Sequence, residues 1–184
     1  RIAAKPHNTC LYTLRSTPYI LHYKLRNTMT TTLLFVGKTT DPHIEALCQE
    51  YLKRLTHYLP VKVQVIPELR NTKALTPEQQ KQAEGEMILR AVTPATELIL
   101  LDEHGKEYRS MEFAQVMQKK MSAGRDVVFA IGGPYGFSQA VYERANSKIS
   151  LSQMTFSHQM VRLFLIEQIY RAMTILRGEP YHHE

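Results

Sequence analysis

Apolar residues fall along the chain in short runs that predict strands. The run at 33–37 ends in glycine, which is typical of a buried strand. The segment 61–66 places valine at every second position, and this period of two predicts a second strand. Further strands are predicted at 97–101, 127–131 and 148–151. Because the run at 127–131 is the most continuously apolar, we expect it at the centre of a sheet.

Helical periodicity and helix-start signals occupy the intervals between these strands. Asp41 precedes Pro42, a combination that caps a helix and presets its first turn. Thr76 and Gln79 form a capping-box pattern at another helix start. The predicted helices run from 42 towards Pro60, from 77 to about 90, from 110, with Ser110 as a cap, to 123, and from 138 to 145. The segment 102–106 is predicted to be a turn.

The last helix is predicted to be the longest, with Thr155 or Ser157 as its cap and Gly178 just beyond its end. Its periodicity predicts a buried face that consists of Met160, Val161, Phe164, Leu165, Gln168, Ile169, Ala172, Met173 and Leu176. Since Phe156, Met160 and Phe164 extend beyond one narrow stripe, we expect part of this helix to lie in an interface.

Strands that alternate with helices of this length predict an α/β domain with a mainly parallel sheet and helices on both faces. Residues 29–184 carry this pattern without internal repeats, so we expect one domain there. Residues 1–28 contain five basic residues and no acidic one, whereas the whole chain has a net charge of +6. The domain itself is therefore near neutral, at +1, and its net charge predicts no broad nucleic-acid surface.

The first 28 residues lack a sustained amphipathic pattern, and Met29 opens a segment that runs directly into the first strand. We expect a mis-assigned start or an added extension; the alternatives are an organelle transit peptide and a basic arm that contacts RNA. All three predict disorder. No apolar run approaches the roughly 20 residues of a membrane helix. We therefore expect a cytoplasmic protein, or an organellar one if residues 1–28 are a transit peptide.

Ligands in parallel α/β sheets bind at the carboxyl ends of the strands. Three segments meet there: Leu101 and Asp102 with the turn at Gly105, the loop 132–136, and the segment 151–156. The loop has three glycines in five residues, which lets backbone approach a ligand closely. We expect a side chain at Gly132 or Gly133 to clash with ligand or strain the turn; a plain tight turn is the alternative.

The segment 151–156 combines hydroxyl and apolar side chains just before a helix N-terminus, where free backbone amides can hold a polar group. An ordinary helix cap is the alternative. His158, Arg162 and Arg171 lie on the last helix, and the tail 181–184 ends the sequence with tyrosine, two histidines and glutamate. These residues are candidates for contact with a substrate. The alternatives are surface residues or satisfied hydrogen-bonding residues on the helix, and a frayed tail.

Several kinds of site find no support in the sequence. It contains no GxGxxG, GxxxxGK[ST] or GxSxG motif, so a dinucleotide site, a phosphate-binding loop and a serine nucleophile elbow have no basis. Cys10 and Cys48 have no CxxC spacing, and His182 and His183 have no HExxH motif or Cys/His quartet beside them. We expect no metal.

Four motifs together resemble the ribosomal large-subunit methyltransferase H family, in that family's order and spacing. They are IGGPYGF at 131–137, LSQMTFSHQMVR at 151–162, EQIYRA at 167–172 and RGEPYHH at 177–183. The segments LFVGK at 34–38 and LLDEHGK at 100–106 fit as well. The resemblance covers all of 29–184, and the combination is specific whereas each motif alone is weak.

This resemblance implies a SPOUT fold with a trefoil knot in its C-terminal half, and a homodimer whose sites lie near the subunit interface. It implies S-adenosylmethionine as the methyl donor. The implied acceptor is N3 of a pseudouridine in the decoding-region stem-loop of 23S rRNA, on assembled ribosomes. The implied cofactor residues are Leu101, Gly132, Leu151, Ser152, Gln153, Met154, Thr155 and Phe156, and we add the adjacent Gly133. On the substrate side we assign His158, Arg162, Tyr181 and His182.

Two parts of the sequence depart from the family. Residues 1–28 have no counterpart, and His183 stands where some relatives have arginine or lysine. Two other functions are kept as alternatives, namely a catalytically silent RNA-binding or ribosome-binding domain and an α/β enzyme with another nucleotide cofactor. Binding of S-adenosylmethionine and methyl transfer to ribosomes would separate the three.

Overall fold

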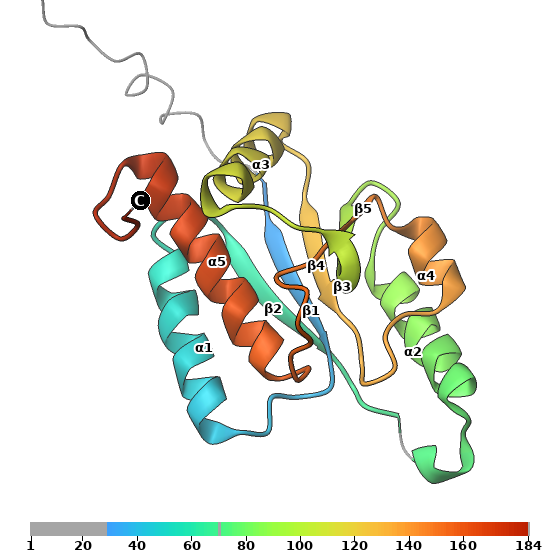
Figure 1. Ribbon diagram of the computed structural model, residues 1–184. Helices are drawn as coiled ribbons and strands as arrows, with labels where there is room; N and C mark the ends of the chain where they lie inside the picture. The colour runs from blue at the N-terminus through green and yellow to red at the C-terminus, as the bar shows by residue number, and fades with distance from the viewer. Residues whose placement is uncertain (1–28, 70, 184) are drawn as a thin grey trace, which may run out of the picture.

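A five-stranded, wholly parallel sheet forms the centre of the protein. The computed structural model describes residues 29–69 and 71–183, so the predictions for residues 1–28 lie outside the described residues. The strands stand in the order β2-β1-β4-β3-β5 (Figure 1). Their bounds are β1 (Thr31–Val36), β2 (Val61–Ile66), β3 (Glu97–Lys106), β4 (Val127–Ile131) and β5 (Ser147–Ile149). The predicted α/β class with a parallel sheet is confirmed.

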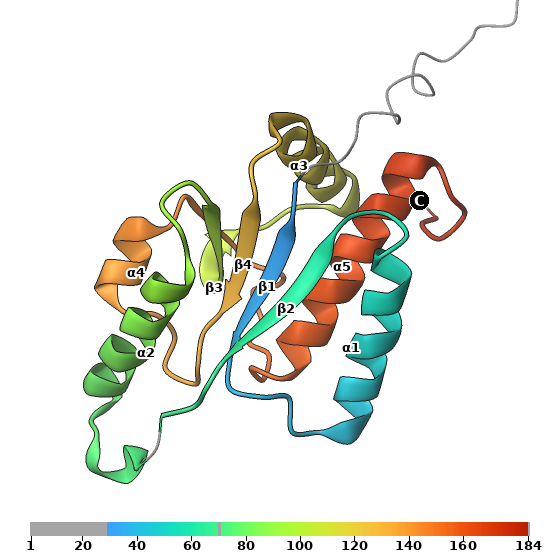
Figure 2. The same cartoon turned by 180° about the vertical axis from the view of Figure 1, so that it is seen from behind.

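Helices cover both faces of the sheet, as the sequence predicts. The main helices are α1 (Pro42–Leu55), α2 (Pro77–Ala91), α3 (Ser110–Ala123), α4 (Gln139–Arg144) and α5 (Met160–Arg177), with the short 3-10 turn η1 (Thr72–Ala74) before α2. Helices α1, α3 and α5 lie on one face, and α2 and α4 lie on the other (Figures 1 and 2). Among the described residues, no helix is both long and apolar enough to cross a bilayer.

Strand β4 is central, and all five of its residues are buried. Its side chains alternate between two cores, because successive residues of a strand point to opposite faces of the sheet. Phe129 packs under α1, α3 and α5, whereas Val128 packs under α2 and α4. Strand β1 divides its side chains in the same way, with Leu33 on the first face and Leu34 on the second. This explains why β4 is continuously apolar and why β1 is apolar from Leu33 to Val36.

The two strongest helix-start predictions are confirmed in atomic detail. The Asp41 carboxylate accepts hydrogen bonds from the amides of His43 (2.8 Å) and Ile44 (3.1 Å), which helix geometry would leave without partners. At α2, the Thr76 hydroxyl and the Gln79 side chain exchange hydrogen bonds with each other's backbone amides. Each signal depends only on residues within four positions, so sequence alone suffices to predict it.

The prediction of a turn at 102–106 is wrong, because β3 continues to Lys106. The strand is irregular there: Leu101 and Lys106 both pair with Ile149 of β5. The extension passes so close to β5 that a Cβ on Gly105 would lie 2.4 Å from the Ile149 carbonyl carbon. Glycine therefore permits a long-range backbone approach here, whereas the local pattern of polar residues indicated a simple turn.

The bounds and the buried face of α5 also differ from the prediction. The helix begins at Met160, although the Ser157 hydroxyl does accept a hydrogen bond from the Met160 amide at 3.2 Å. The face that is buried against the domain consists of Arg162, Leu165, Ile166, Ile169, Ala172, Met173 and Thr174. Five residues that the periodicity placed on that face are half-buried: Met160, Val161, Phe164, Gln168 and Leu176. Arg162, Ile166 and Thr174 are buried in their place.

Candidate functional site

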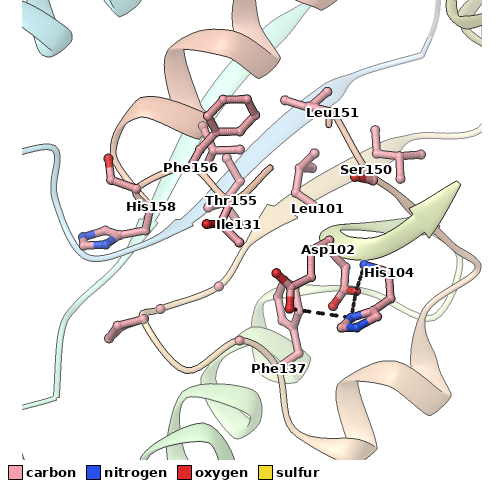
Figure 3. Close-up of a pocket in the computed structure, with 18 of the residues that line it drawn as sticks. Leu101, Asp102, His104, Ile131, Phe137, Ser150, Leu151, Thr155, Phe156 and His158 are labelled. Carbon is pink, nitrogen blue, oxygen red and sulfur yellow. Dashed lines mark hydrogen bonds and ion pairs between the residues drawn. The ribbon is translucent and has the colours of Figure 1, made fainter. Parts of the chain in front are cut away.

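A pocket of about 580 Å³ opens where the three predicted loop segments meet (Figure 3). Its wall combines β3 residues around Leu101, the loop 131–137 after β4, and the segment 149–158 between β5 and α5. Parallel strands bring their carboxyl ends together at one edge, which is where α/β sheets bind ligands. Its size falls within the range of roughly 300–1,000 Å³ that is usual for small-molecule sites. The predicted convergence of the three segments is confirmed.

The glycine loop after β4 is folded by a backbone hydrogen bond and leaves little space for a side chain at Gly132. Gly136 has a positive φ of 80°, and its amide donates to the Gly133 carbonyl at 3.1 Å. A Cβ on Gly132 would lie 3.1 Å from the Gly136 carbonyl oxygen and 3.2 Å from the Phe137 ring. A side chain there would therefore displace the loop that forms this wall of the pocket.

Gly133 requires glycine for a different reason from the one predicted. A Cβ at this position would lie 2.4 Å from Oε2 of Glu84, a residue of α2 beneath the loop. The protein itself therefore already crowds this position, and a clash with a ligand stays a prediction. Neither Gly132 nor Gly133 has a positive φ, so the expectation of turn strain is corrected. Gly133 lines the pocket.

Glu84 is a buried carboxyl group under the glycine loop, with 3% of its surface exposed. Gln80 donates to Oε1 at 2.8 Å, whereas Oε2 has no hydrogen-bond partner among the described residues. Burial raises the pKa of Glu84, the hydrogen bond from Gln80 opposes this shift, and the nearby Glu68 charge reinforces it. The loop is therefore supported from below by a polar group whose burial costs free energy.

The segment between β5 and α5 is folded by its own hydroxyl groups. The Ser150 hydroxyl donates to the Ser152 carbonyl at 2.8 Å, and the Ser152 hydroxyl accepts from the Met154 amide at 2.9 Å. These bonds turn the chain before α5 and bring its residues to the pocket wall. The predicted cofactor residues from this segment that line the pocket are Leu151, Ser152, Met154, Thr155 and Phe156. Gln153 is exposed and is not among the lining residues.

Two of the predicted substrate-side residues have sharply different surroundings. His158 lines the pocket (Figure 3). Arg162 is fully buried, and its guanidinium donates to the Val36 carbonyl at 2.7 Å and to the Thr39 hydroxyl at 3.1 Å. Burial lowers the pKa of Arg162. The assignment of Arg162 to the substrate is therefore corrected, because it fastens the start of α5 to the end of β1.

The C-terminal tail packs into a group of four aromatic rings, which we call the tyrosine cluster: Tyr51, Tyr58, Tyr170 and Tyr181. The Tyr170 ring contacts each of the other three edge-on, with centroids 4.8–5.7 Å apart. The Tyr181 hydroxyl lies 3.0 Å from the Glu167 carboxylate, and Tyr58 donates to Glu179. Neither Tyr181 nor His182 lines the pocket of its own chain.

Sequence reasoning placed Asp102 in a candidate segment but missed Tyr142, with which it forms a polar pair on the pocket wall. The Tyr142 hydroxyl donates to Asp102 Oδ2 at 2.5 Å, and the His104 amide donates to Oδ1 at 2.8 Å. Burial and the Asp102 charge raise the pKa of Tyr142, so the phenol keeps its proton. The two residues are forty positions apart, and the predicted turn concealed the strand that carries Asp102.

Within residues 29–69 and 71–183, no three His, Cys, Asp or Glu side chains gather as metal ligands would. Cys48 is a buried free thiol, and burial is the main reason that its pKa rises to about 11. The pocket offers instead hydroxyl groups, one fixed carboxylate, backbone and apolar side chains. This donor set fits an organic ligand with both polar and apolar parts.

A family model described as predicted SPOUT methyltransferase matches residues 29–182. The chain belongs to the SPOUT methyltransferase family. A relative from Bacteroides fragilis named ribosomal RNA large subunit methyltransferase H is 58% identical over 157 residues, which is 85% of this chain and 100% of the relative. A relative of the same name from Flavobacterium psychrophilum is 53% identical over 153 residues, covering 83% of this chain and 98% of its own.

The crystal structure of a probable methyltransferase from Bordetella pertussis Tohama I has the same fold as this SPOUT methyltransferase. It matches with a TM-score of 0.50 at 13% identity, over 80% of this chain and 96% of the other. At that identity the likeness concerns the fold alone. The C-terminal trefoil knot stays a prediction of the family resemblance.

Proposed function

We propose that the protein transfers a methyl group from S-adenosylmethionine to N3 of a pseudouridine in the decoding-region stem-loop of 23S rRNA, on assembled ribosomes. One observation carries the proposal. The relatives named for ribosomal RNA large-subunit methylation are 53–58% identical and are matched over 98–100% of their length. Residues 29–184 therefore span everything that such a relative contains, including each segment of the pocket wall.

The pocket suits the cofactor by size and by chemistry. S-adenosylmethionine has an apolar purine face, polar ribose hydroxyls and a charged amino-acid end. Apolar contact is available from Leu101, Ile131 and Phe156, and hydrogen-bonding groups are available from Asp102 and Thr155 (Figure 3). Folded loops hold these groups in place before any ligand arrives, which lowers the entropic cost of binding.

Bound S-adenosylmethionine would supply an electrophilic methyl group without the help of a metal. The tasks left to the protein are to hold the acceptor nitrogen in line with that methyl and to keep water away. Pseudouridine N3 also carries a proton that must be removed or whose loss must be stabilised. His158 lines the pocket and is the residue that we assign to this proton, because neutral imidazole is a base near pH 7.

Tyr181 and His182, the other substrate-side residues, lie outside the pocket of their own chain. We propose that they act on the pocket of a second copy in a homodimer. Helix α5 offers half-buried apolar side chains, Leu163 and Phe164, beside the exposed Phe156 and Met154 at the pocket rim. The Phe156 and Phe164 rings lie 4.8 Å apart, and together they give this side of the molecule an apolar surface suited to association.

The test is transfer of labelled methyl from S-adenosylmethionine to ribosomes that lack the modification, followed by mass spectrometry of the nucleosides. We expect one methyl per ribosome, found on pseudouridine at N3. Free 23S rRNA and intact ribosomes are compared to establish which is the substrate. Absence of transfer to either, with cofactor binding intact, would support the alternative of a silent ribosome-binding domain.

A further inference from the structure

Asp102 has the most unusual surroundings of the polar side chains on the pocket wall. Its side chain is only 8% exposed, yet it faces the pocket beside Leu101 and His104 (Figure 3). No lysine or arginine forms an ion pair with it among the described residues; the nearest cationic candidate is the exposed His104 ring, with Nδ1 at 3.5 Å. A nearly buried carboxylate with so little compensation is costly unless something else contacts it.

The Asp102 carboxylate is held in one orientation. Oδ2 accepts from the Tyr142 hydroxyl at 2.5 Å, and Oδ1 accepts from the His104 amide at 2.8 Å. An ionised carboxylate has roughly four positions for hydrogen-bond donors. One donor on each oxygen leaves about one further position on each. The structure thus offers two adjacent acceptors, fixed in direction, on the wall of the pocket.

We propose that Asp102 binds the two ribose hydroxyls of the methyl donor, and that Tyr142 positions its carboxylate for this contact. The inference rests on the proposed function, since it takes S-adenosylmethionine as the ligand. A vicinal diol presents two O–H donors side by side, which matches two fixed acceptors on one carboxylate. Acidic residues near strand ends bind ribose hydroxyls by the same chemistry in dinucleotide-binding sheets.

The alternative partner for Asp102 is the positively charged sulfonium of the same ligand. Attraction between two charges falls off gradually with distance and requires no particular orientation of the carboxylate. The Tyr142 hydroxyl and the His104 amide fix both carboxylate oxygens in direction. A fixed direction favours hydrogen bonds from ligand hydroxyls, which are directional. The fixed geometry is therefore the reason for assigning the diol and not the cation.

The experiment measures binding by calorimetry with S-adenosylhomocysteine, which lacks the sulfonium charge, and with its 2′-deoxy and 3′-deoxy analogues. For the wild-type protein we expect each missing hydroxyl to weaken binding by about 10-fold or more, the effect of a hydrogen bond to a charged group. Asp102→Asn should weaken binding of the parent ligand by roughly 10- to 100-fold and should reduce the penalty for either deoxy analogue to below about 3-fold.

Two further variants separate the roles of charge and orientation. Tyr142→Phe retains the carboxylate but frees Oδ2, so we expect a smaller loss of affinity with discrimination against the deoxy analogues partly retained. Glu107→Gln removes an exposed carboxylate that does not line the pocket and should bind all ligands as the wild type does. Circular dichroism checks that each variant folds; if Asp102→Asn does not, the analogue series with wild type and Tyr142→Phe decides, since unchanged discrimination in Tyr142→Phe would contradict the inference.

Each contrary result has its own meaning. Equal binding of the parent and deoxy ligands by the wild type would overturn the ribose assignment alone. If Asp102→Asn binds S-adenosylhomocysteine normally but S-adenosylmethionine weakly, Asp102 serves the sulfonium and the inference is wrong. Failure of the wild type to bind either S-adenosylmethionine or S-adenosylhomocysteine would overturn the proposed function itself.

Discussion

The pocket and the tyrosine cluster meet opposite physical requirements. In the pocket, Asp102 has acceptor capacity to spare, and Glu84 beneath the wall has an oxygen without a partner. In the cluster, no buried side-chain oxygen among the described residues lacks a hydrogen bond, and the rings cover one another. The pocket therefore has polar capacity left for a ligand, whereas the cluster is satisfied without one.

The contrast also separates residues that the sequence had grouped. Motifs lie at both ends of α5, yet only the segment before the helix and the first turn, through Val161, reach the pocket. An α-helix of 18 residues is about 27 Å long. The tail folds back along α5 as far as Glu167, whose carboxylate accepts a hydrogen bond from the Tyr181 hydroxyl. Cofactor binding and substrate handling should therefore be separable by mutation, and the predictions below test this.

The largest effect is expected at the pocket wall. Gly132→Val should weaken binding of S-adenosylmethionine by more than about 100-fold, because even a Cβ there would crowd the Gly136 carbonyl and the Phe137 ring. Calorimetry measures the affinity, and circular dichroism should show nearly unchanged helix content. As a control, Gly178→Ala adds a Cβ with no atom within 4 Å; its positive φ of 67° costs stability, but the affinity should be kept. Normal binding by the valine variant would refute the pocket assignment.

Deleting residues 181–184 should have the complementary effect. We expect methyl transfer to ribosomes to fall by about 100-fold or more, because misplaced reacting groups cost that much. Affinity for S-adenosylmethionine should stay within a few-fold of wild type. Tyr181→Phe is the matched variant: it retains the ring contact with Tyr170 and removes the bond to Glu167. A collapse of cofactor binding on deletion would place the tail over the donor pocket and contradict the separation.

A mixture of the two defective proteins tests whether the tail acts across a dimer. When the Gly132→Val chain and the chain lacking 181–184 are mixed in equal amounts, about half of the dimers contain one chain of each kind. Each such dimer has one intact pocket facing one intact tail, which is one working site of two. The mixture should therefore regain about a quarter of wild-type transfer. Light scattering reports the oligomeric state of each sample. A monomer at micromolar concentration, or a mixture as inactive as its components, would show that no partner supplies the tail.

The smallest effect concerns stability at the pocket. Glu84→Met should raise the free energy of unfolding by about 1–2 kcal/mol at pH 8, because it removes a buried carboxyl with an unsatisfied oxygen. The pKa of Glu84 is raised in the folded state. The glutamate therefore destabilises the folded protein increasingly as the pH rises above the pKa that Glu84 has in the unfolded chain. The gain in the free energy of unfolding from Glu84→Met should therefore shrink towards pH 4. Urea unfolding measures it, and the exposed Glu86→Met serves as a control expected to change little.

The parts of the fold that sequence predicted correctly depend on nearby residues. The caps at Asp41 and Thr76 act within three positions, and the apolar run of β4 reveals its own burial. The errors arise where distant backbone decides the outcome. Arg162 is buried because the Val36 carbonyl, 126 positions away, accepts its hydrogen bond. No local pattern contains that information.

The candidate site follows the same division. The glycine loop and the segment 151–156 were predicted because unusual residues are concentrated there. Asp102 was included in a candidate segment, but its pairing with Tyr142 was missed because the pair forms only when β3 and α4 come together. Glu84 was missed for a related reason: on a helix, its sequence neighbours do not show that Gly133 packs against it.

The parallel sheet also has a consequence for the synthesis of the protein. Strand β1 pairs with β2 on one side and with β4 on the other, and β4 begins 91 positions after β1 ends. At about 5–20 residues per second, a ribosome needs roughly 5–18 seconds to cover that interval. During this time one edge of β1, a strand whose six residues are all buried in the folded protein, is without its partner. The nascent chain therefore passes through a period in which chaperone binding competes with aggregation, before β4 emerges and pairs with β1.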